Sequence, residues 1–197
     1  MCTRVAALLV ASVFFCVFAP LTSFATTVEQ QSLRKMATEA PSIVHGTVVS
    51  TSSRWTENRS LIVTDVRFQV HEVLKGDAVS EVVVTQPGGT VGAIRVDADG
   101  AVAHRPGEEA ILFLKQSPRG HTYVAGLFQG RFNVVEDSRG NKTVRGLSPE
   151  HVNVLRSAPG TGGGGTLRAG PSGAVPLDDF LGGVRDLVRD AVKDGGR

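Results

Sequence analysis

Residues that could carry chemistry are sparse and widely separated in this 197-residue chain. The histidines stand at positions 45, 71, 104, 121 and 151. His71 and Glu72 begin the His-Glu-x-x-His pattern of zinc peptidases, but position 75 is Lys and the surrounding segment alternates like a strand. A Gly-x-Ser-x-Gly motif for a serine nucleophile is also missing. The sequence therefore predicts no catalytic residue, no metal ligand and no cofactor, and we expect a protein that is not an enzyme.

Two weaker metal signals have simpler interpretations. Asp97, Asp99 and Gly100 resemble part of a calcium loop, but the further acidic ligands that such a loop requires do not follow. We therefore interpret this segment as a hairpin turn. The histidines are far apart along the chain, so we interpret each of them as a surface or strand-edge residue.

Two segments could form an interaction surface. Trp55 lies in a polar segment, Ser52 to Ser60, that we interpret as a loop; there it could contact a partner or fold over the end of a β-structure. Gly88 and Gly89 could allow a ligand to approach the backbone, although tight strand geometry explains them as well and is the interpretation we favour.

The first 25 residues have the pattern of a cleavable signal peptide. Arg4 precedes an uncharged run from Val5 to Phe18, and Ser23-Phe24-Ala25 places small residues at the two positions that a signal peptidase reads. Both cysteines, Cys2 and Cys16, lie in this segment, so we expect no disulfide in the mature chain. The sequence predicts an exported protein, periplasmic or extracellular.

Composition limits the classes of partner. Lys and Arg number 21 against 19 Asp and Glu, and aromatic residues make up 6% of the chain. Such balanced charge gives no reason to expect nucleic acid as a partner. A second apolar run long enough to span a bilayer is not present, so we expect no transmembrane span in the mature chain.

The mature chain reads as a mostly β protein. Residues 26–39 are expected to form a short helix capped by Thr27, and residues 40–157 a β domain. Within that domain, the run Ala110 to Leu114 is apolar on both faces and predicts a central strand. The expected strands are Ser42–Thr51, Leu61–Leu74, Val79–Gln86, Glu109–Lys115, His121–Leu127, Gly130–Glu136 and Lys142–Gly146. Strands at this spacing, without intervening helices, indicate an antiparallel barrel or sandwich.

The C-terminal part divides into a linker and a helix. Residues 158–174 are rich in glycine and are expected to form a flexible linker. Residues 175–197 carry apolar side chains at helical spacing, among them Phe180 and Leu187, and predict an amphipathic helix. The sequence leaves open whether this helix docks on its own barrel or offers Phe180 and Leu187 to a partner.

Part of the chain resembles a known group. The chain resembles uncharacterised bacterial secreted proteins in five segments. They are the segments around His45-Gly46, Leu74-Lys75-Gly76, Gly88-Gly89 and Pro106-Gly107-Glu108, and the segment Gly126 to Phe132. Those bacterial proteins in turn are similar to the netrin-like domains and tissue inhibitors of metalloproteinases, over about residues 40 to 136. The resemblance implies a small five-stranded barrel of the oligonucleotide/oligosaccharide-binding (OB) type, here with an extra C-terminal hairpin. The inhibitors act through an amino-terminal Cys, which the expected mature chain lacks, so that chemistry is not carried over.

These observations together predict a non-catalytic, exported binding module of the bacterial envelope or secretome. Its partner would be an unidentified protein or glycan, bound by the barrel face or loops. The alternative is a peptidase inhibitor that acts through a loop, for which Ser52 to Ser60 is the candidate. The residues that we expect at an interaction surface are Trp55, Gly88, Gly89, Phe180 and Leu187.

Overall fold

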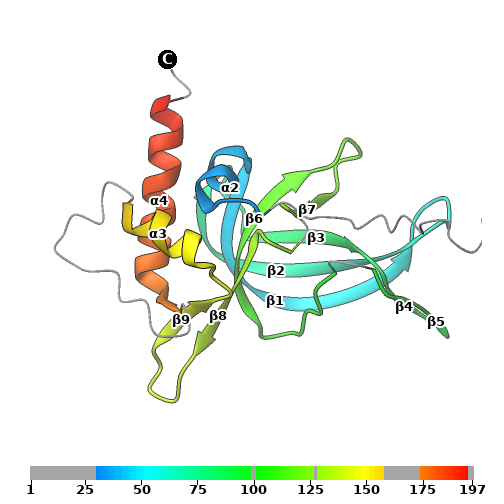
Figure 1. Cartoon of the computed structure of the whole chain (residues 1–197). Helices are drawn as coiled ribbons and strands as arrows, with labels where there is room; N and C mark the ends of the chain where they lie inside the picture. Colours follow the sequence, from blue (N-terminus) through cyan, green and yellow to red (C-terminus); the bar gives the residue numbers. More distant parts are fainter. Residues whose placement is uncertain (1–29, 99–100, 127, 158–173, 195–197) are drawn as a thin grey trace, which may run out of the picture.

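A computed structural model of the chain describes residues 30–98, 101–126, 128–157 and 174–194 (Figure 1). The expected signal peptide, residues 1–25, lies outside the described residues. The same is true of the expected linker except for Ala174.

The chain is mostly β, as predicted, and most of its strands form one large sheet. The strands of that sheet are β1 (Ser42–Trp55), β2 (Ile62–Lys75), β3 (Glu81–Pro87), β6 (Glu109–Gln116), β7 (Thr122–Val124), β8 (Arg131–Glu136), β9 (Lys142–Arg145) and β10 (Val175–Pro176). They are paired in the order β1-β2-β3-β7-β6-β8-β9-β10, and β1 also pairs with β6. The run β1-β2-β3-β7-β6 therefore returns to β1. All of these pairings are antiparallel except that of β3 with β7, which is parallel through Val84 and Thr122.

One hydrophobic core lies on the side of β1, β2, β3 and β6 that faces into this ring of strands. The alternation of β2 places Val66 and Phe68 in it, where they pack with Val84 of β3 and Leu112 of β6. Gly46 lies where the register between β1 and β2 shifts. A Cβ on Gly46 would come within 2.5 Å of the backbone oxygen of Gln69, so the two strands could not approach as closely.

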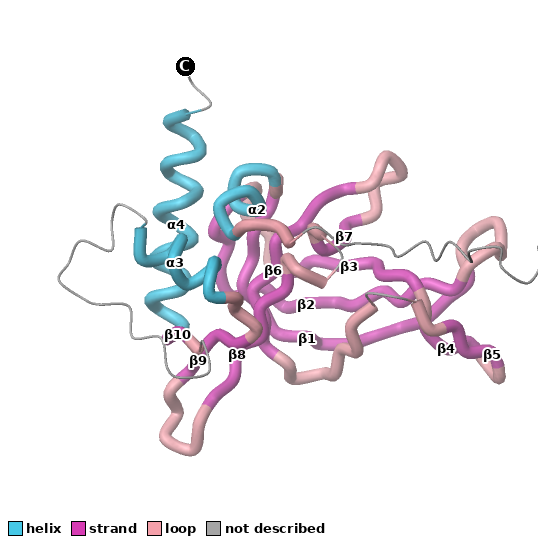
Figure 2. Tube along the Cα trace, viewed as in Figure 1, coloured by secondary structure: helices cyan, strands magenta, loops and turns pink. Residues whose placement is uncertain are grey.

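A second core lies on the outer face of the sheet, where three helices cover it at one end of the molecule (Figure 2). The helices are α2 (Leu33–Glu39), α3 (Pro149–Ser157) and α4 (Leu177–Asp194). Ile111 and Phe113 of β6 belong to this second core, whereas Leu112 belongs to the first. β6 is thus buried on both faces and is a central strand, as its apolar run predicted. None of the described helices has the length and hydrophobicity that a membrane span requires.

The structure answers the question that the sequence left open about the C-terminal helix. α4 packs against its own sheet, and Phe180 and Leu187 are 0% and 1% exposed. The expectation that these two residues form an interaction surface is therefore wrong. Their spacing is that of an apolar helix face, which a pattern in the sequence cannot assign to an internal or an external partner.

Several element boundaries differ from those expected. α2 begins at Leu33, not near Thr27, because the Ser32 hydroxyl accepts a hydrogen bond from the Lys35 amide at 3.2 Å and caps the helix there. β1 extends to Trp55, so this residue ends a strand and does not lie in a loop. β7 is shorter than expected and covers only Thr122–Val124.

One helix and three short strands, β10 among them, were not predicted. α3 begins at Pro149, directly after Ser148, and the Ser148 hydroxyl accepts a hydrogen bond from the His151 amide at 3.3 Å. A serine followed by proline is a usual helix start, so the sequence did contain this signal. The strands β4 (Gly89–Val91) and β5 (Ile94–Val96) form a small hairpin of their own, paired with each other. They are only three residues long, too short for a hydrophobic period to be recognised.

Candidate functional site

The candidate site is a cleft at the end of the molecule that lies away from the helices, where the hairpin β4-β5 extends from the sheet (Figure 1). The cleft has a volume of about 510 Å³. It is lined by Thr51, Ser53, Thr64, Gln86, Pro87, Gly88, Gly89, Thr90, Arg95, Val96, Asp97, Ala98, Ala101, Val102, Ala103 and His104. We refer to it as the hairpin cleft.

Two of the five residues expected at an interaction surface, Gly88 and Gly89, line the hairpin cleft. Trp55 is half-buried and is not among the lining residues. It pairs with Ile62 across β1 and β2, and the Gly88 amide donates to the Ile62 carbonyl at 2.9 Å. Phe180 and Leu187 lie in the helix-covered core instead.

The geometry of Gly88 and Gly89 explains why glycine stands at both positions. Their φ angles are +85° and +134°, a region that side chains other than glycine rarely adopt. A Cβ on Gly89 would also collide with the hydroxyl oxygens of Ser53 and Thr64. Tight packing of the backbone against the strands is therefore sufficient to account for the glycine pair, as the sequence favoured.

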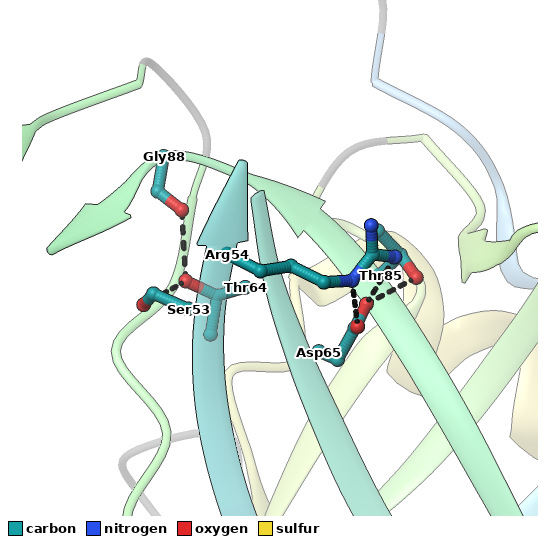
Figure 3. Close-up of polar contacts among 6 residues, drawn as sticks. All are labelled: Ser53, Arg54, Thr64, Asp65, Thr85 and Gly88. Carbon is teal, nitrogen blue, oxygen red and sulfur yellow. Dashed lines mark hydrogen bonds and ion pairs between the residues drawn. The ribbon is translucent and has the colours of Figure 1, made fainter. Parts of the chain in front are cut away.

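Polar contacts attach the hairpin to the sheet on the cleft side (Figure 3). The Ser53 and Thr64 hydroxyls lie 2.9 Å apart, and the Thr64 hydroxyl donates to the Gly88 carbonyl at 2.8 Å. The Ser53 hydroxyl in turn accepts a hydrogen bond from the Thr90 amide at 3.3 Å. These contacts link β1, β2 and β4, so they hold the hairpin in a fixed position against the two strands that contribute Ser53 and Thr64 to the cleft.

A second group of polar contacts joins β1 and β2 to β3 on the other face of these strands (Figure 3). The Arg54 Nε donates to the Asp65 carboxylate at 2.6 Å, and the Thr85 hydroxyl donates to it at 2.7 Å. Partial burial favours the neutral carboxyl, but the hydrogen bonds from Arg54 and Thr85 and the nearby charges of Arg54 and His121 outweigh it, so the pKa of Asp65 is lowered. An ionised Asp65 thus joins β1, β2 and β3.

The lining of the hairpin cleft is suited to binding by hydrogen bonds. Thr51, Ser53, Thr64 and Thr90 supply hydroxyl groups, and Arg95 and Asp97 supply an exposed ion pair of 2.8 Å at the rim. Gln86 is held by donating its side-chain amide to the Val102 carbonyl at 2.9 Å, which orients it. Hydroxyls, amides and exposed charges can recognise the hydroxyl groups of a sugar or the backbone of a peptide.

The turn expected at Asp97, Asp99 and Gly100 follows β5 and is only partly described. Asp97 pairs with Arg95, two residues earlier, and the Ala101 amide donates a hydrogen bond to the Ala98 carbonyl at 3.1 Å. The turn of the hairpin β4-β5 itself lies between Val91 and Ile94. Asp99 and Gly100 lie outside the described residues.

The histidines are less dispersed in space than in sequence. His45 is buried, 7% exposed, and its Nε2 lies 2.7 Å from Glu109, which also accepts a hydrogen bond from Lys142 at 2.7 Å. His71 bonds to the Thr47 hydroxyl, and its ring centroid lies 5.4 Å from that of His45. His71 is exposed, as expected of a surface residue, whereas the expectation is wrong for the buried His45.

This cluster fits a structural role better than a catalytic one. Burial disfavours ionisation of Glu109, but hydrogen bonds from Lys142 and His45 outweigh it and lower the pKa of this carboxyl. The Thr47 hydroxyl contacts His71, whereas the Glu109 carboxylate contacts His45. Neither imidazole therefore connects a hydroxyl group with a carboxylate, as the histidine of a catalytic triad does. Within residues 30–98, 101–126, 128–157 and 174–194, no three His, Cys, Asp or Glu side chains are placed to hold a metal ion.

His151 is also buried, which was not expected. It is 6% exposed, its ring lies edge-on to Phe132 at 5.5 Å, and its Nε2 lies 3.2 Å from the Gln31 carbonyl. It joins α3 to the segment before α2 and is part of the core.

Comparisons with known proteins add no family to this description. A scan against models of protein families found no match. A search of curated proteins found no significant match either. The function must therefore be argued from the site.

Proposed function

We propose that this chain is a non-catalytic, exported binding module of the bacterial envelope or secretome, and that the hairpin cleft is where it binds its partner. The observation that carries the proposal is the cleft itself: an open concavity of about 510 Å³ that is lined by hydroxyl, amide and exposed charged groups. Concave sites with a few convergent polar groups are the usual form of a binding site. Because hydroxyl groups dominate the polar lining, we favour a glycan over a protein as the partner.

The order of strand pairing supports a relationship to OB-type barrels. Five strands follow one another in the pairing order β1-β2-β3-β7-β6, and the last of them, β6, pairs again with the first, β1. OB barrels are five-stranded, partly open, and bind oligosaccharides or oligonucleotides on one face and in the adjacent loops. Fold alone does not carry function, so this relationship adds support only together with the cleft.

The location of the protein is part of the same proposal. Its support is the pattern of the first 25 residues, with one basic residue, an apolar run and small residues before the cleavage point. A glycan partner would fit the periplasm or the cell exterior, where such polymers are accessible.

The proposal is tested by measuring glycan binding of residues 26–197 and of one cleft variant. Thr90 is exposed in the short strand β4 and lines the cleft, so Thr90→Arg narrows the cleft without disturbing a core. Asn153→Arg is the matched control, because Asn153 is exposed on α3, among the helices at the other end of the molecule (Figure 1). Binding to envelope glycan fragments would be followed by calorimetry, and to envelope proteins by affinity capture.

We expect the wild-type chain and Asn153→Arg to bind a glycan equally, and Thr90→Arg to bind at least ten-fold more weakly. If only a protein is captured, and Thr90→Arg loses it, the cleft is the site and its ligand is a polypeptide. Retention by all three chains, or by none, would contradict the assignment of this cleft.

A second candidate function is peptidase inhibition through the turn between β1 and β2. The turn is held by hydrogen bonds from the Thr56 amide to the Leu61 carbonyl and from the Arg59 amide to the Thr56 carbonyl, both 2.8 Å. It presents Arg59 and Leu61 to solvent, and Leu61 is 59% exposed. An ordered turn with exposed side chains could enter a peptidase without a large entropy cost. Arg59→Ala should then abolish inhibition of an envelope peptidase at micromolar concentration.

A further inference from the structure

A small cavity adjoins the hairpin cleft at the point where β3 and β7 diverge, and the two share Gln86, Pro87, Val102 and His104 in their linings. The two strands are joined through Val84 and Thr122, and the residues that follow on each strand line the cavity. Its volume is about 80 Å³. It is lined by Val84, Thr85, Gln86, Pro87, Val102, His104, Tyr123, Val124, Phe128 and Arg131.

An arginine is buried at this cavity. The Arg131 side chain is only 5% exposed, and its Nη2 donates to the Glu108 carboxylate at 3.0 Å. Its Nε is buried and has no hydrogen-bond partner in the part of the chain that the structure describes. Buried polar groups are almost always paired, and the cost of leaving one unpaired is largest for a charged group. Arg131 therefore retains a donor that a bound molecule could use.

A second unpaired nitrogen belongs to the same lining. The Nδ1 atom of His104 is buried and likewise lacks a hydrogen-bond partner among the described residues. The His104 ring is fixed edge-on to Phe68, with centroids 5.6 Å apart. Two nitrogen atoms without partners thus belong to residues that line one cavity, on side chains that packing holds in place.

The electrostatics of the cavity favour an anion. Burial lowers the pKa of Arg131, and the charge of Glu108 offsets this only in part. Burial and the charge of Arg131 together lower the pKa of His104 to about 4, so its imidazole is neutral near pH 7. Both shifts are caused mainly by burial, and at Arg131 the ion pair with Glu108 offsets only part of the cost of burying the charge. A monoanion placed beside Arg131 would relieve the cost of burying its charge.

The remaining walls are mostly apolar and set the size of the ligand. Val84, Val102 and Val124 contribute aliphatic surface, and Tyr123 and Phe128 are 38% and 48% exposed at the outer side. A cavity of this volume holds about six water molecules. It would therefore accept a molecule of about that number of heavy atoms with a short apolar part.

We propose that this cavity binds a small monocarboxylate with a short aliphatic chain. The carboxylate accepts hydrogen bonds from the Arg131 Nε–H and from the His104 Nδ1–H, in the tautomer that carries the proton on that nitrogen. The aliphatic chain lies against the valine side chains. This site adjoins the hairpin cleft, but its ligand differs in chemistry from the proposed glycan, so binding of each ligand can be measured by itself.

The experiment compares butyrate with 1-butanol, two probes with the same number of carbon atoms of which only butyrate carries a charge. The protein is residues 26–197 labelled with ¹⁵N, and the titration follows the NMR signals of the Arg131 Nε–H and the His104 ring. We expect butyrate to shift both signals in a saturable way and to bind at least ten-fold more tightly than 1-butanol. Equal binding of the two probes, or no shift of either signal, would overturn the proposal.

Two variants test the role of each nitrogen. Arg131→Lys keeps the charge next to Glu108 but removes the Nε donor, and we expect it to weaken butyrate binding at least ten-fold. His104→Phe keeps the ring against Phe68 and removes both ring nitrogens, with an expected loss of three-fold or more; it remains informative if Arg131→Lys does not fold. Asn153→Arg, on the exposed side of α3 and outside both linings, serves as the control and should bind butyrate like the wild type. Unchanged binding by folded Arg131→Lys and His104→Phe would show that the carboxylate lies elsewhere.

Discussion

Gly89 combines an unusual backbone conformation with close packing, and the two effects can be separated by substitution. Gly89→Ala imposes a side chain on a φ of +134° and brings its Cβ into collision with Ser53 and Thr64. Gly92→Ala, in the same hairpin, meets only the backbone cost, because a Cβ there has no neighbour within 4 Å and φ is +60°.

We expect Gly89→Ala to lower the free energy of unfolding by about 1–3 kcal/mol more than Gly92→Ala does. Urea denaturation of both variants, followed by circular dichroism, measures the difference. Equal losses would mean that the hydroxyl groups of Ser53 and Thr64 move aside freely, and that the hairpin is not tightly attached to the sheet.

His104 should make the stability of the protein depend on pH in a defined window. Its pKa is about 4 in the folded chain and near 6.5 when unfolded, so the unfolded state binds more protons between these values. Stability should therefore fall as pH decreases from about 6.5 to 4. The midpoint of urea unfolding, measured at several pH values in this range, tests whether stability falls with decreasing pH. In His104→Phe the midpoint should depend less on pH.

The comparison with His104→Phe is needed because carboxylates also make the stability of the protein depend on pH at low pH. The pKa values of Asp65 and Glu109 are lowered in the folded chain. Each carboxylate therefore stabilises the fold at pH values above its pKa in the unfolded chain, and this stabilisation is lost as the pH falls through its pKa in the folded chain. Only the difference between wild type and His104→Phe isolates the histidine. The same slope in both proteins would show that His104 titrates normally.

At the scale of the element, α4 contains two adjacent glycines with different surroundings. A Cβ on Gly182 has no neighbour within 4 Å, whereas one on Gly183 would come within 2.6 Å of the Leu155 Cδ2 of α3. Alanine favours a helix over glycine at both positions by about 1 kcal/mol. Gly182→Ala should therefore raise the free energy of unfolding by up to about 1 kcal/mol.

We expect Gly183→Ala to raise the free energy of unfolding by less than Gly182→Ala does, or to lower it, because the Leu155 side chain must shift to make room. Thermal or urea unfolding of the two variants gives the comparison. An equal gain at both positions would contradict the close contact between α3 and α4.

At the scale of the whole molecule, α4 completes the core that the sheet leaves open. Phe180, Leu181, Val184 and Leu187 are all buried against the outer face of the sheet and the other helices. Burying each such side chain stabilises the fold by about 1.5–3 kcal/mol. Their sum is comparable with the whole stability of a typical domain, about 5–15 kcal/mol.

A chain that ends at Ser157 should therefore lose cooperative unfolding and expose apolar surface. Near-ultraviolet circular dichroism and binding of a hydrophobic dye measure both effects. A chain cleaved between residues 158 and 173, with both fragments retained, is the control and should keep its tertiary signal. A truncated chain with an unchanged unfolding midpoint would show that α4 is dispensable.

The sequence by itself determined the local elements, because their patterns are local. Alternation along 61–74 predicted a half-buried strand, the apolar run 110–114 a central one, and the spacing of Phe180 and Leu187 an amphipathic helix. Each of these patterns repeats within a few residues, so neighbouring positions suffice to recognise it. The glycine pair at 88 and 89 was also interpreted correctly as tight strand geometry, because glycine is the residue that readily adopts their positive φ angles.

Only the tertiary structure decided which surfaces meet. His45 and Glu109 are 64 positions apart, and Arg131 stands at a position that reads as the polar face of a strand, yet packing buries its side chain. The apolar face of α4 could have met another molecule, but it packs on this sheet. Burial and pairing of this kind depend on long-range contacts, which no periodicity encodes, and both the hairpin cleft and the cavity at Arg131 arise from them.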